Sequence, residues 1–240
     1  MWSICKKELH QFYSNLTGYI AIILFLLVSG IYLFILKDSN LFDFGYATLD
    51  SFFELAPWIL IFLVPAITMR SLSEEFKTGT FEILKTKPLT NWQIVNGKYL
   101  SLLIVLLFVI VPTFIYLLTI KSLSATGNID GGGILGSYIG LFFVAAVFAA
   151  ISLCCSSFTS NAVVAFLISA FVCLLLYYGF NALSKLPVFV GWADYYIEML
   201  GIDFHYRSTG RGVIDSRDII YYLSIIYMFL LITMHNLKKR

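Results

Sequence analysis

The chain has 240 residues, of which 60% are hydrophobic and only 12% are charged, and its mean hydropathy is +0.88. Soluble domains carry about 25% charged residues, so this composition excludes a disordered chain, a nucleic-acid-binding module and an ordinary cytosolic enzyme. The formal net charge of +2 is too small to indicate an electrostatic partner. A membrane helix needs about 20 apolar residues, so the chain has room for several membrane helices and little else.

The first segment of the chain is amphipathic. Its apolar and polar residues separate at helical spacing, with Trp2, Cys5, Leu9, Phe12 and Leu16 on one side and Lys6, Lys7, His10 and Gln11 on the other. This pattern predicts an interfacial helix that leads into a membrane span. A cleaved signal peptide is the competing interpretation. Signal peptides have a shorter apolar core, about 7–15 residues, and a small-residue cleavage site, which is not apparent here.

Six nearly uncharged apolar stretches follow, at about 18–36, 52–68, 99–120, 134–154, 161–180 and 219–234. Pro57 and Pro65 lie in the second stretch and Pro112 in the third. Proline is tolerated in a membrane helix because neighbouring groups satisfy the freed carbonyl. The sequence therefore predicts an all-α integral membrane protein, a single domain over residues 1–240 with six transmembrane helices.

The distribution of lysine and arginine predicts the orientation. The side that holds the N-terminal segment, the loop 70–98 and the C-terminus has ten of them, and the other side has six. Basic residues accumulate in cytoplasmic loops. We therefore expect both termini and the loop 70–98 in the cytoplasm, and the loop 181–218 on the outer side.

Sequence signs of catalysis or of ion coupling are scarce. The chain has no GxxxxGK[ST] nucleotide-binding motif and no HExxH motif, and its three histidines are far apart in sequence. We expect no metal and no cofactor. Proton-coupled transporters keep ionisable groups at mid-depth, but here Glu54 is the only acid close to the core of a span. The driving force of a six-span protein of this kind must come from elsewhere.

One acidic pair next to the membrane could suggest an enzyme. Intramembrane proteases of the CAAX type use a Glu-Glu pair followed by an arginine four residues after the second glutamate. Glu74 and Glu75 form such a pair, but Gly79 stands at the arginine position. A solvated helical face is the simpler interpretation of this pair.

The loop from Arg70 to Leu100 carries the most information. Ser71 or Ser73 is expected to cap a short helix, Gly79 interrupts it, and Thr90 is expected to cap a second helix that runs into the third span. Four apolar residues are expected to be exposed on the first helix and after its break: Leu72, Phe76, Ile83 and Leu84. Such a loop suits either docking of another protein or contact with lipid headgroups.

This loop resembles the signature of ABC-2-type transporter permeases. The family pattern has an arginine leaving span two, then Glu-x-x-x-Gly-Thr-x-Glu-x-Leu, a proline, and Gly-Lys entering span three. The matching residues are Arg70, Glu75, Gly79, Thr80, Glu82, Leu84, Pro88, Gly97 and Lys98. The six spans and the amphipathic first helix also match, so the resemblance covers the whole chain. The stretch RGVIDSRDIIYYLSII, from Arg211, resembles the gliding-motility-associated permease subunits of Bacteroidetes.

The resemblance implies a permease subunit of an ATP-driven exporter in the bacterial inner membrane. A separate ABC ATPase subunit would dock on the loop between spans two and three, and a second permease subunit, identical or different, would complete the membrane part. The implied docking residues are Glu75, Gly79, Thr80, Glu82, Leu84 and Pro88. The implied partners are these subunits and the lipid bilayer, with no nucleic acid.

Alternatives remain open at this stage. The chain could be a non-transporting membrane anchor in a motility or secretion complex, or an intramembrane enzyme. Gly136 and Gly140 form a GxxxG pair, which either packs helices within the subunit or joins two subunits. We favour packing within the subunit, because small residues serve any close helix crossing.

Overall fold

The computed structural model describes residues 1–14, 16–36, 48–123, 130–187, 189, 191, 193–210, 212 and 215–239. Within these ranges the regular structure is entirely helical, without any strand. The predicted all-α class is therefore confirmed. Three basic residues used for the orientation, Lys37, Arg211 and Arg240, lie outside the described ranges, as does part of the stretch that follows Arg211.

The long helices match the predicted spans in order, with shifted ends. They are α2 (Leu16–Phe34), α3 (Asp50–Thr68), α6 (Asn91–Ile110), α8 (Gly131–Phe158), α9 (Ala162–Leu174) and α13 (Ser216–Lys239). Two of them continue after a local break. The 3-10 turn η1 (Val111–Thr113) joins α6 to α7 (Phe114–Leu123), and the π-helical turn η2 (Leu175–Gly179) joins α9 to α10 (Phe180–Ser184).

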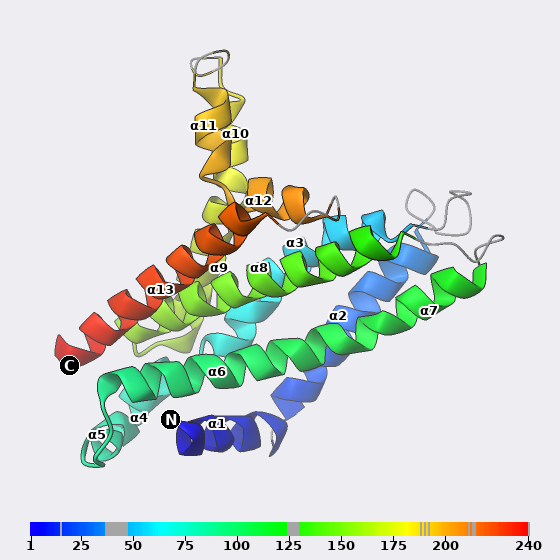
Figure 1. Ribbon diagram of the computed structural model, residues 1–240. Helices are drawn as coiled ribbons and strands as arrows, with labels where there is room; N and C mark the ends of the chain where they lie inside the picture. Colours follow the sequence, from blue (N-terminus) through cyan, green and yellow to red (C-terminus); the bar gives the residue numbers. More distant parts are fainter. Residues whose placement is uncertain are drawn as a thin grey trace.

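The short helices lie at the two ends of the bundle (Figure 1). The predicted amphipathic helix is α1 (Trp2–Ser14), and the loop after α3 contains α4 (Ser73–Thr78) and α5 (Thr80–Lys85). Both chain termini lie toward the end that carries α4 and α5. At the other end are α11 (Asp194–Met199), which projects together with α10, and α12 (Ile202–Thr209).

Among the described residues, five helical stretches are long and apolar enough to cross a membrane: Asp50–Thr78, Asn91–Ser122, Gly131–Phe158, Ala162–Ser184 and Ser216–Lys239. A sixth is added when α1 and α2, which are bent by 67° relative to each other, are counted as one span. These helices make the chain an integral membrane protein with five to six candidate spans.

The stretch Asn91–Ser122 changes from α-helix to a 3-10 turn at Pro112. Pro112 lies in η1, where the following Thr113 hydroxyl donates a hydrogen bond to the Ile110 carbonyl at 2.7 Å. The Tyr138 hydroxyl on α8 donates to the Thr113 carbonyl at 3.1 Å. Side-chain hydroxyls therefore satisfy backbone groups near the break inside the bundle.

Helix α8 forms the centre of the bundle. In its most apolar 18-residue window 83% of the residues are buried, against 28% in α13. It contacts α3, α6, α9, α12 and α13. Its row of small buried residues lets these neighbours approach closely, and it consists of Ala145, Ala146, Ala149 and Ala150.

The GxxxG pair of α8 packs against the same chain. A Cβ atom added to Gly136 would lie 2.6 Å from the Thr209 carbonyl oxygen at the end of α12, and one added to Gly140 would collide with the Thr209 hydroxyl. Both glycines are therefore occupied by a contact within the subunit. This agrees with the interpretation favoured from the sequence.

We predict that Gly136→Ala lowers the thermal stability of the purified chain, because the neighbour that it meets is backbone and cannot rotate away. Overpacking of this kind costs about 1–3 kcal/mol. Gly131→Ala is the matched control, since its added methyl group meets nothing within 4 Å. Unfolding can be followed with a thiol dye, because the four cysteines are free and buried. Equal melting temperatures for the two variants would contradict the packing.

Candidate functional site

The loop between α3 and α6 is built around a glycine break, as the sequence predicts. Helix α4 ends at Thr78, and Gly79 adopts φ +71°, in the left-handed region. Glycine suits this backbone conformation because it has no Cβ atom. After it α5 begins at Thr80, so the two short helices meet at an angle fixed by one residue.

The two ends of the loop differ in how they are capped. At the far end Thr90 caps α6, and Gln93 completes a capping box, as expected. At the near end the expected serine cap is wrong. The residue before α4 is Leu72, without a side-chain cap, and the Ser73 hydroxyl donates instead to the Met69 carbonyl one turn earlier. The chain from α3 enters α4 in a nearly helical conformation, so no serine is free to act as a cap.

The apolar residues of the loop mostly face inward. Leu72 is fully buried and Phe81 is 5% exposed, so the expected exposure is wrong for Leu72. Phe76 packs edge-on against Phe81, with the ring centroids 5.0 Å apart, and Leu84 is half-buried against the core. Ile83 is the apolar residue of α5 that remains exposed, with 63% of its surface accessible.

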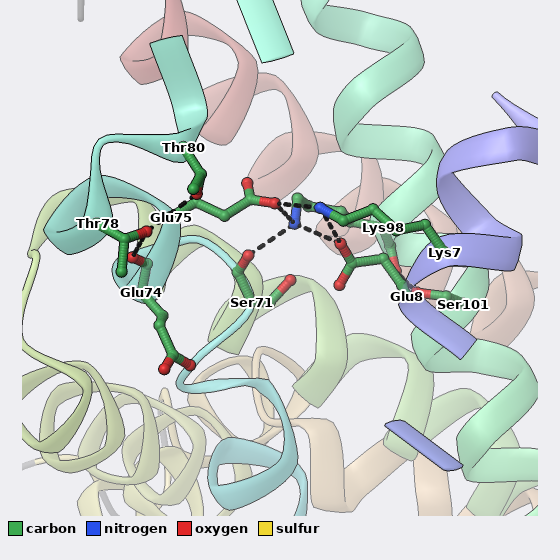
Figure 2. Close-up of polar contacts among 9 residues, drawn as sticks. All are labelled: Lys7, Glu8, Ser71, Glu74, Glu75, Thr78, Thr80, Lys98 and Ser101. Atoms are coloured by element: carbon green, nitrogen blue, oxygen red, sulfur yellow. Dashed lines mark hydrogen bonds and ion pairs between the residues drawn. The ribbon is translucent and has the colours of Figure 1, made fainter. Parts of the chain in front are cut away.

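Glu75 faces the membrane helices and joins an ion-pair cluster (Figure 2). The ammonium group of Lys98 on α6 lies 2.8 Å from Glu8 Oε1 on α1 and 3.0 Å from Glu75 Oε1 on α4. It also donates to the Ser71 carbonyl at 2.7 Å. Lys98 is only 1% exposed. A buried ammonium group is tolerated only when it is paired and hydrogen-bonded, and here it donates hydrogen bonds to Glu8 and to the Ser71 carbonyl and forms an ion pair with Glu75.

Lys7 balances the charge of this cluster. Its Nζ lies 3.0 Å from Glu75 Oε1, so the cluster contains two ammonium groups and two carboxylates. Burial acts to lower the pKa of Lys7, but the hydrogen bond and charge of Glu75, together with Glu8, outweigh it and raise that pKa. Glu74 points away from the cluster (Figure 2). The Glu-Glu pair therefore does not converge on a common site.

Gly97 explains how α1 reaches the cluster. A Cβ atom at this position would lie 3.0 Å from the Ile4 Cβ atom and 3.0 Å from the Met1 carbonyl oxygen. The absence of a side chain lets α1 lie directly on α6, beside Lys98. The ABC-2 permease pattern includes Gly97 and Lys98 but not Glu8, so the sequence did not predict that Glu8 belongs to this cluster. The signal was a lysine at the start of a membrane helix, which needs a carboxylate partner from elsewhere.

The other predicted docking residues lie on the surface of the loop. Gly79, Thr80, Glu82 and Pro88 are exposed, whereas Leu84 is half-buried. Of the six predicted docking residues, Glu75 and Leu84 therefore face inward and the other four face outward.

A hollow of about 450 Å³ lies between α4 and the turn that joins α8 to α9. Arg70, Glu74 and Lys77 line one wall, and residues 160–163 in the turn between α8 and α9 line the other. The end of the bundle that carries α4 and α5 thus presents a concave surface with charged and apolar groups, which is a form suited to receiving another protein.

Comparison with known protein families gives a match to ABC-2 family transporter proteins over residues 2–187. This range covers most of the chain, from α1 through α10. The chain therefore belongs to the ABC-2 family of transporter proteins. No curated protein matches the chain.

Family membership makes the chain a membrane permease component of an ABC transport system. Such a component does not carry the catalytic centre itself, and membership implies a membrane context and an ABC ATPase as partner. Consistent with this division, the sequence has no phosphate-binding GxxxxGK[ST] motif.

We predict that Lys98→Met strongly lowers the stability of the purified chain, because it leaves the partly buried carboxylates of Glu8 and Glu75 with Lys7 alone. Removing one partner of a buried ion pair costs about 3–5 kcal/mol. Lys87→Met, at an exposed position of the same loop, is the control and should change little. Adding Glu8→Gln to Lys98→Met should recover part of the loss, and a melting temperature unaffected by Lys98→Met would rule out the cluster.

Proposed function

We propose that the chain is the permease subunit of an ATP-driven exporter and that a separate ABC ATPase docks on α4 and α5. The observation that carries this proposal is the cluster around Lys98, which ties α4 to α1 and α6. A loop that only rested on lipid headgroups would need no such anchor. A loop that receives force from a partner needs a stiff connection to the helices that it moves.

The proposed docking face is the outward side of α5 with the adjoining hollow. Thr80 and Glu82 offer polar contacts, and Ile83 offers an apolar anchor that is 63% exposed. Small interfaces gain most of their energy from a few such anchors seated in a pocket of the partner. Glu75 and Leu84, both implied by the resemblance, would act in this arrangement by holding the loop in place.

Force applied to α5 would reach the membrane helices by two routes. Through Phe81 and Phe76, which pack at 5.0 Å, α5 is linked to α4. From α4 the backbone continues into α3, and Glu75 connects to α1 and α6 through Lys98. Closure of two ATPases would thus rotate α4, α1 and α6 together rather than bend the loop alone.

A second permease subunit, identical or different, completes the proposed transporter. Helices α2 and α9 correspond to the spans that the resemblance places at the seam between subunits. Their exposed faces are almost wholly apolar, and include Ile20, Ile23, Leu27 and Ile31 on α2 and Val164, Leu167, Ile168 and Phe171 on α9. Such faces suit lipid as well as protein, so subunit contact here stays part of the proposal.

The link to gliding motility is the most specific part of the proposal, and it rests on the sequence resemblance alone. The stretch from Arg211 that carries it lies beyond residue 187, where the family match ends. A non-transporting anchor would use the same docking loop without ATP-dependent movement. Liposome transport with and without the ATPase separates these two functions.

We predict that Ile83→Asp releases the ATPase while the permease still inserts and folds. An unpaired charge buried in the contact costs several kcal/mol, which is enough to lose a micromolar complex. The measurement is co-purification of the ATPase encoded next to this chain. Ile83→Val is the matched control and should retain the ATPase. Leu84→Asp should instead lower the stability of the chain, because Leu84 packs inward.

The docking proposal would be overturned if the ATPase co-purified unchanged with a correctly folded Ile83→Asp variant. Loss of the ATPase with Ile83→Val alone would also contradict it, since valine preserves the apolar anchor.

We also predict that the loop and both termini lie in the cytoplasm. A cysteine introduced at Lys85 should react with a membrane-impermeant thiol reagent only in broken cells, because α5 is on the cytoplasmic side. A cysteine at Tyr196, which is 71% exposed on α11, should react in intact cells. The reverse pattern would invert the orientation and remove the ATPase from reach of the loop.

A further inference from the structure

A second hollow, of about 510 Å³, lies at the opposite end of the bundle from the docking loop. Residues of α3, α8, η2, α10 and α12 line it. Its lining includes the aromatic residues Trp58, Tyr177 and Tyr178 and the polar residues Glu54, Asn181 and Asp203. The proposed ATPase would dock at the other end of the bundle and would not occupy this hollow.

One wall of the hollow is aromatic. The ring of Trp58 lies 5.8 Å from that of Tyr177, nearly perpendicular to it, and 5.5 Å from that of Tyr178. Both tyrosines reach the same tryptophan because they belong to the π-helical turn η2. Isolated π-helical turns are costly and are frequent at functional sites. Trp58 remains 37% exposed and Tyr178 41% exposed, so ring surface is available to a ligand.

The charges at the hollow leave an excess of carboxylate. Arg207 forms ion pairs with Asp203 and with Glu198, the latter at 3.3 Å. The hydrogen bond from Arg207 to Asp203 raises the pKa of Arg207, which fixes this pairing. Asp50 and Glu54 also line the hollow, and neither has an ion-pair partner among the described residues.

Glu54 is the carboxylate best placed to act with the aromatic wall. It precedes Trp58 by four residues on α3, so both project from the same face of that helix. Lys185 is the remaining cation of the lining, and it forms no ion pair with the described residues either. Two free carboxylates against one free ammonium group give the hollow a net negative charge.

Asn181 adds a buried hydrogen-bond acceptor. Its side chain is 3% exposed, and its amide nitrogen donates to Glu198 Oε1 at 3.0 Å and to Asp203 Oδ2 at 3.4 Å. Its amide oxygen has no partner among the described residues. A buried acceptor without a donor is energetically costly. A ligand that brings an N–H group into the hollow would remove this cost.

We propose that the hollow is a binding site for a ligand that carries a protonated alkylamino group. Aromatic faces attract cations, the Glu54 carboxylate supplies the opposite charge, and the Asn181 oxygen accepts an N–H hydrogen bond. Glu54 would repel an anion. A neutral molecule would leave the negative charge of Glu54 uncompensated. The amine can belong to a small molecule or to a lysine side chain of a peptide.

The test uses the fluorescence of Trp58 in the purified chain in lipid nanodiscs, with Trp2, Trp92 and Trp192 replaced by phenylalanine. n-Butylammonium is titrated against n-butanol and butyrate, which have similar apolar parts but no positive charge. A peptide with a single lysine is compared with its Nε-acetylated form, to distinguish a peptide source from a free amine. Calorimetry with the unaltered chain gives a second readout that does not depend on the tryptophan replacements.

We expect saturable binding of at least one ammonium probe and none of the uncharged or anionic probes. Glu54→Gln should weaken this binding at least about tenfold, and Asp194→Asn, an acid of α11 outside the hollow, should leave it within about twofold. Equal responses to n-butylammonium and n-butanol, unchanged binding in Glu54→Gln, or no saturable binding in either assay would overturn the proposal. Because no ATPase is present, these outcomes leave the docking proposal untouched.

Discussion

The buried ammonium group of Lys98 is the constraint on which the end of the molecule that carries α4 and α5 depends. A lysine that is 1% exposed at the start of a membrane helix must keep acceptors around it. It takes them from three separate segments, through Glu8, Glu75 and the Ser71 carbonyl. None of these segments can move away alone without leaving a charge unpaired, so α1, the start of α4 and α6 form one unit.

This unit gives the amphipathic helix a structural role beyond contact with lipid. Its residue Glu8 pairs with Lys98, and Gly97 provides the flat surface on which Ile4 rests. Because α1 precedes α2 in the chain, the proposed displacement of the loop would be passed to the first membrane helix as well as to α6. An interfacial helix that only followed the lipid surface would not be coupled to the loop in this way.

The sequence predicts well those features that depend on neighbours along the chain. Thr90 caps α6 as predicted, with Gln93 three residues on completing a capping box, and Gly79 breaks the helix where the pattern places the break. The apolar stretches likewise predict the membrane helices in the right order, because a helix that lies in lipid must consist mostly of apolar residues. Their ends shift by a few residues, since α8 runs over Gly131–Phe158 and the predicted span covers 134–154.

Features that depend on distant segments could not be predicted in the same way. The partners of Lys98 lie 90 residues away at Glu8 and 27 residues away at Ser71. The same limit applies to Asp218 in the first turn of α13. It is buried and pairs with His205, Nδ1 to Oδ1 at 2.6 Å, while His205 Nε2 lies 3.0 Å from the Met199 carbonyl oxygen.

The two ends of the molecule handle charge in opposite ways, and this difference separates their roles. At the end that carries α4 and α5, two ammonium groups and two carboxylates are matched, and Lys98 at their centre is buried, which favours a rigid part. At the other end Glu54 has no ion-pair partner among the described residues and lies beside partly exposed aromatic rings, which favours the binding of a ligand.

One helical stretch, Asp50–Thr78, connects these two ends. Glu54 stands near its beginning and Glu75 near its end, and at 1.5 Å per residue they are about 30 Å apart along the axis. An occupant of the outer hollow and an ATPase on α5 would therefore act on opposite ends of the same stretch. Coupling between them requires that each favours one of two positions of this stretch. Its packing against the buried helix α8 makes a shift of the whole stretch more favourable than a bend within it.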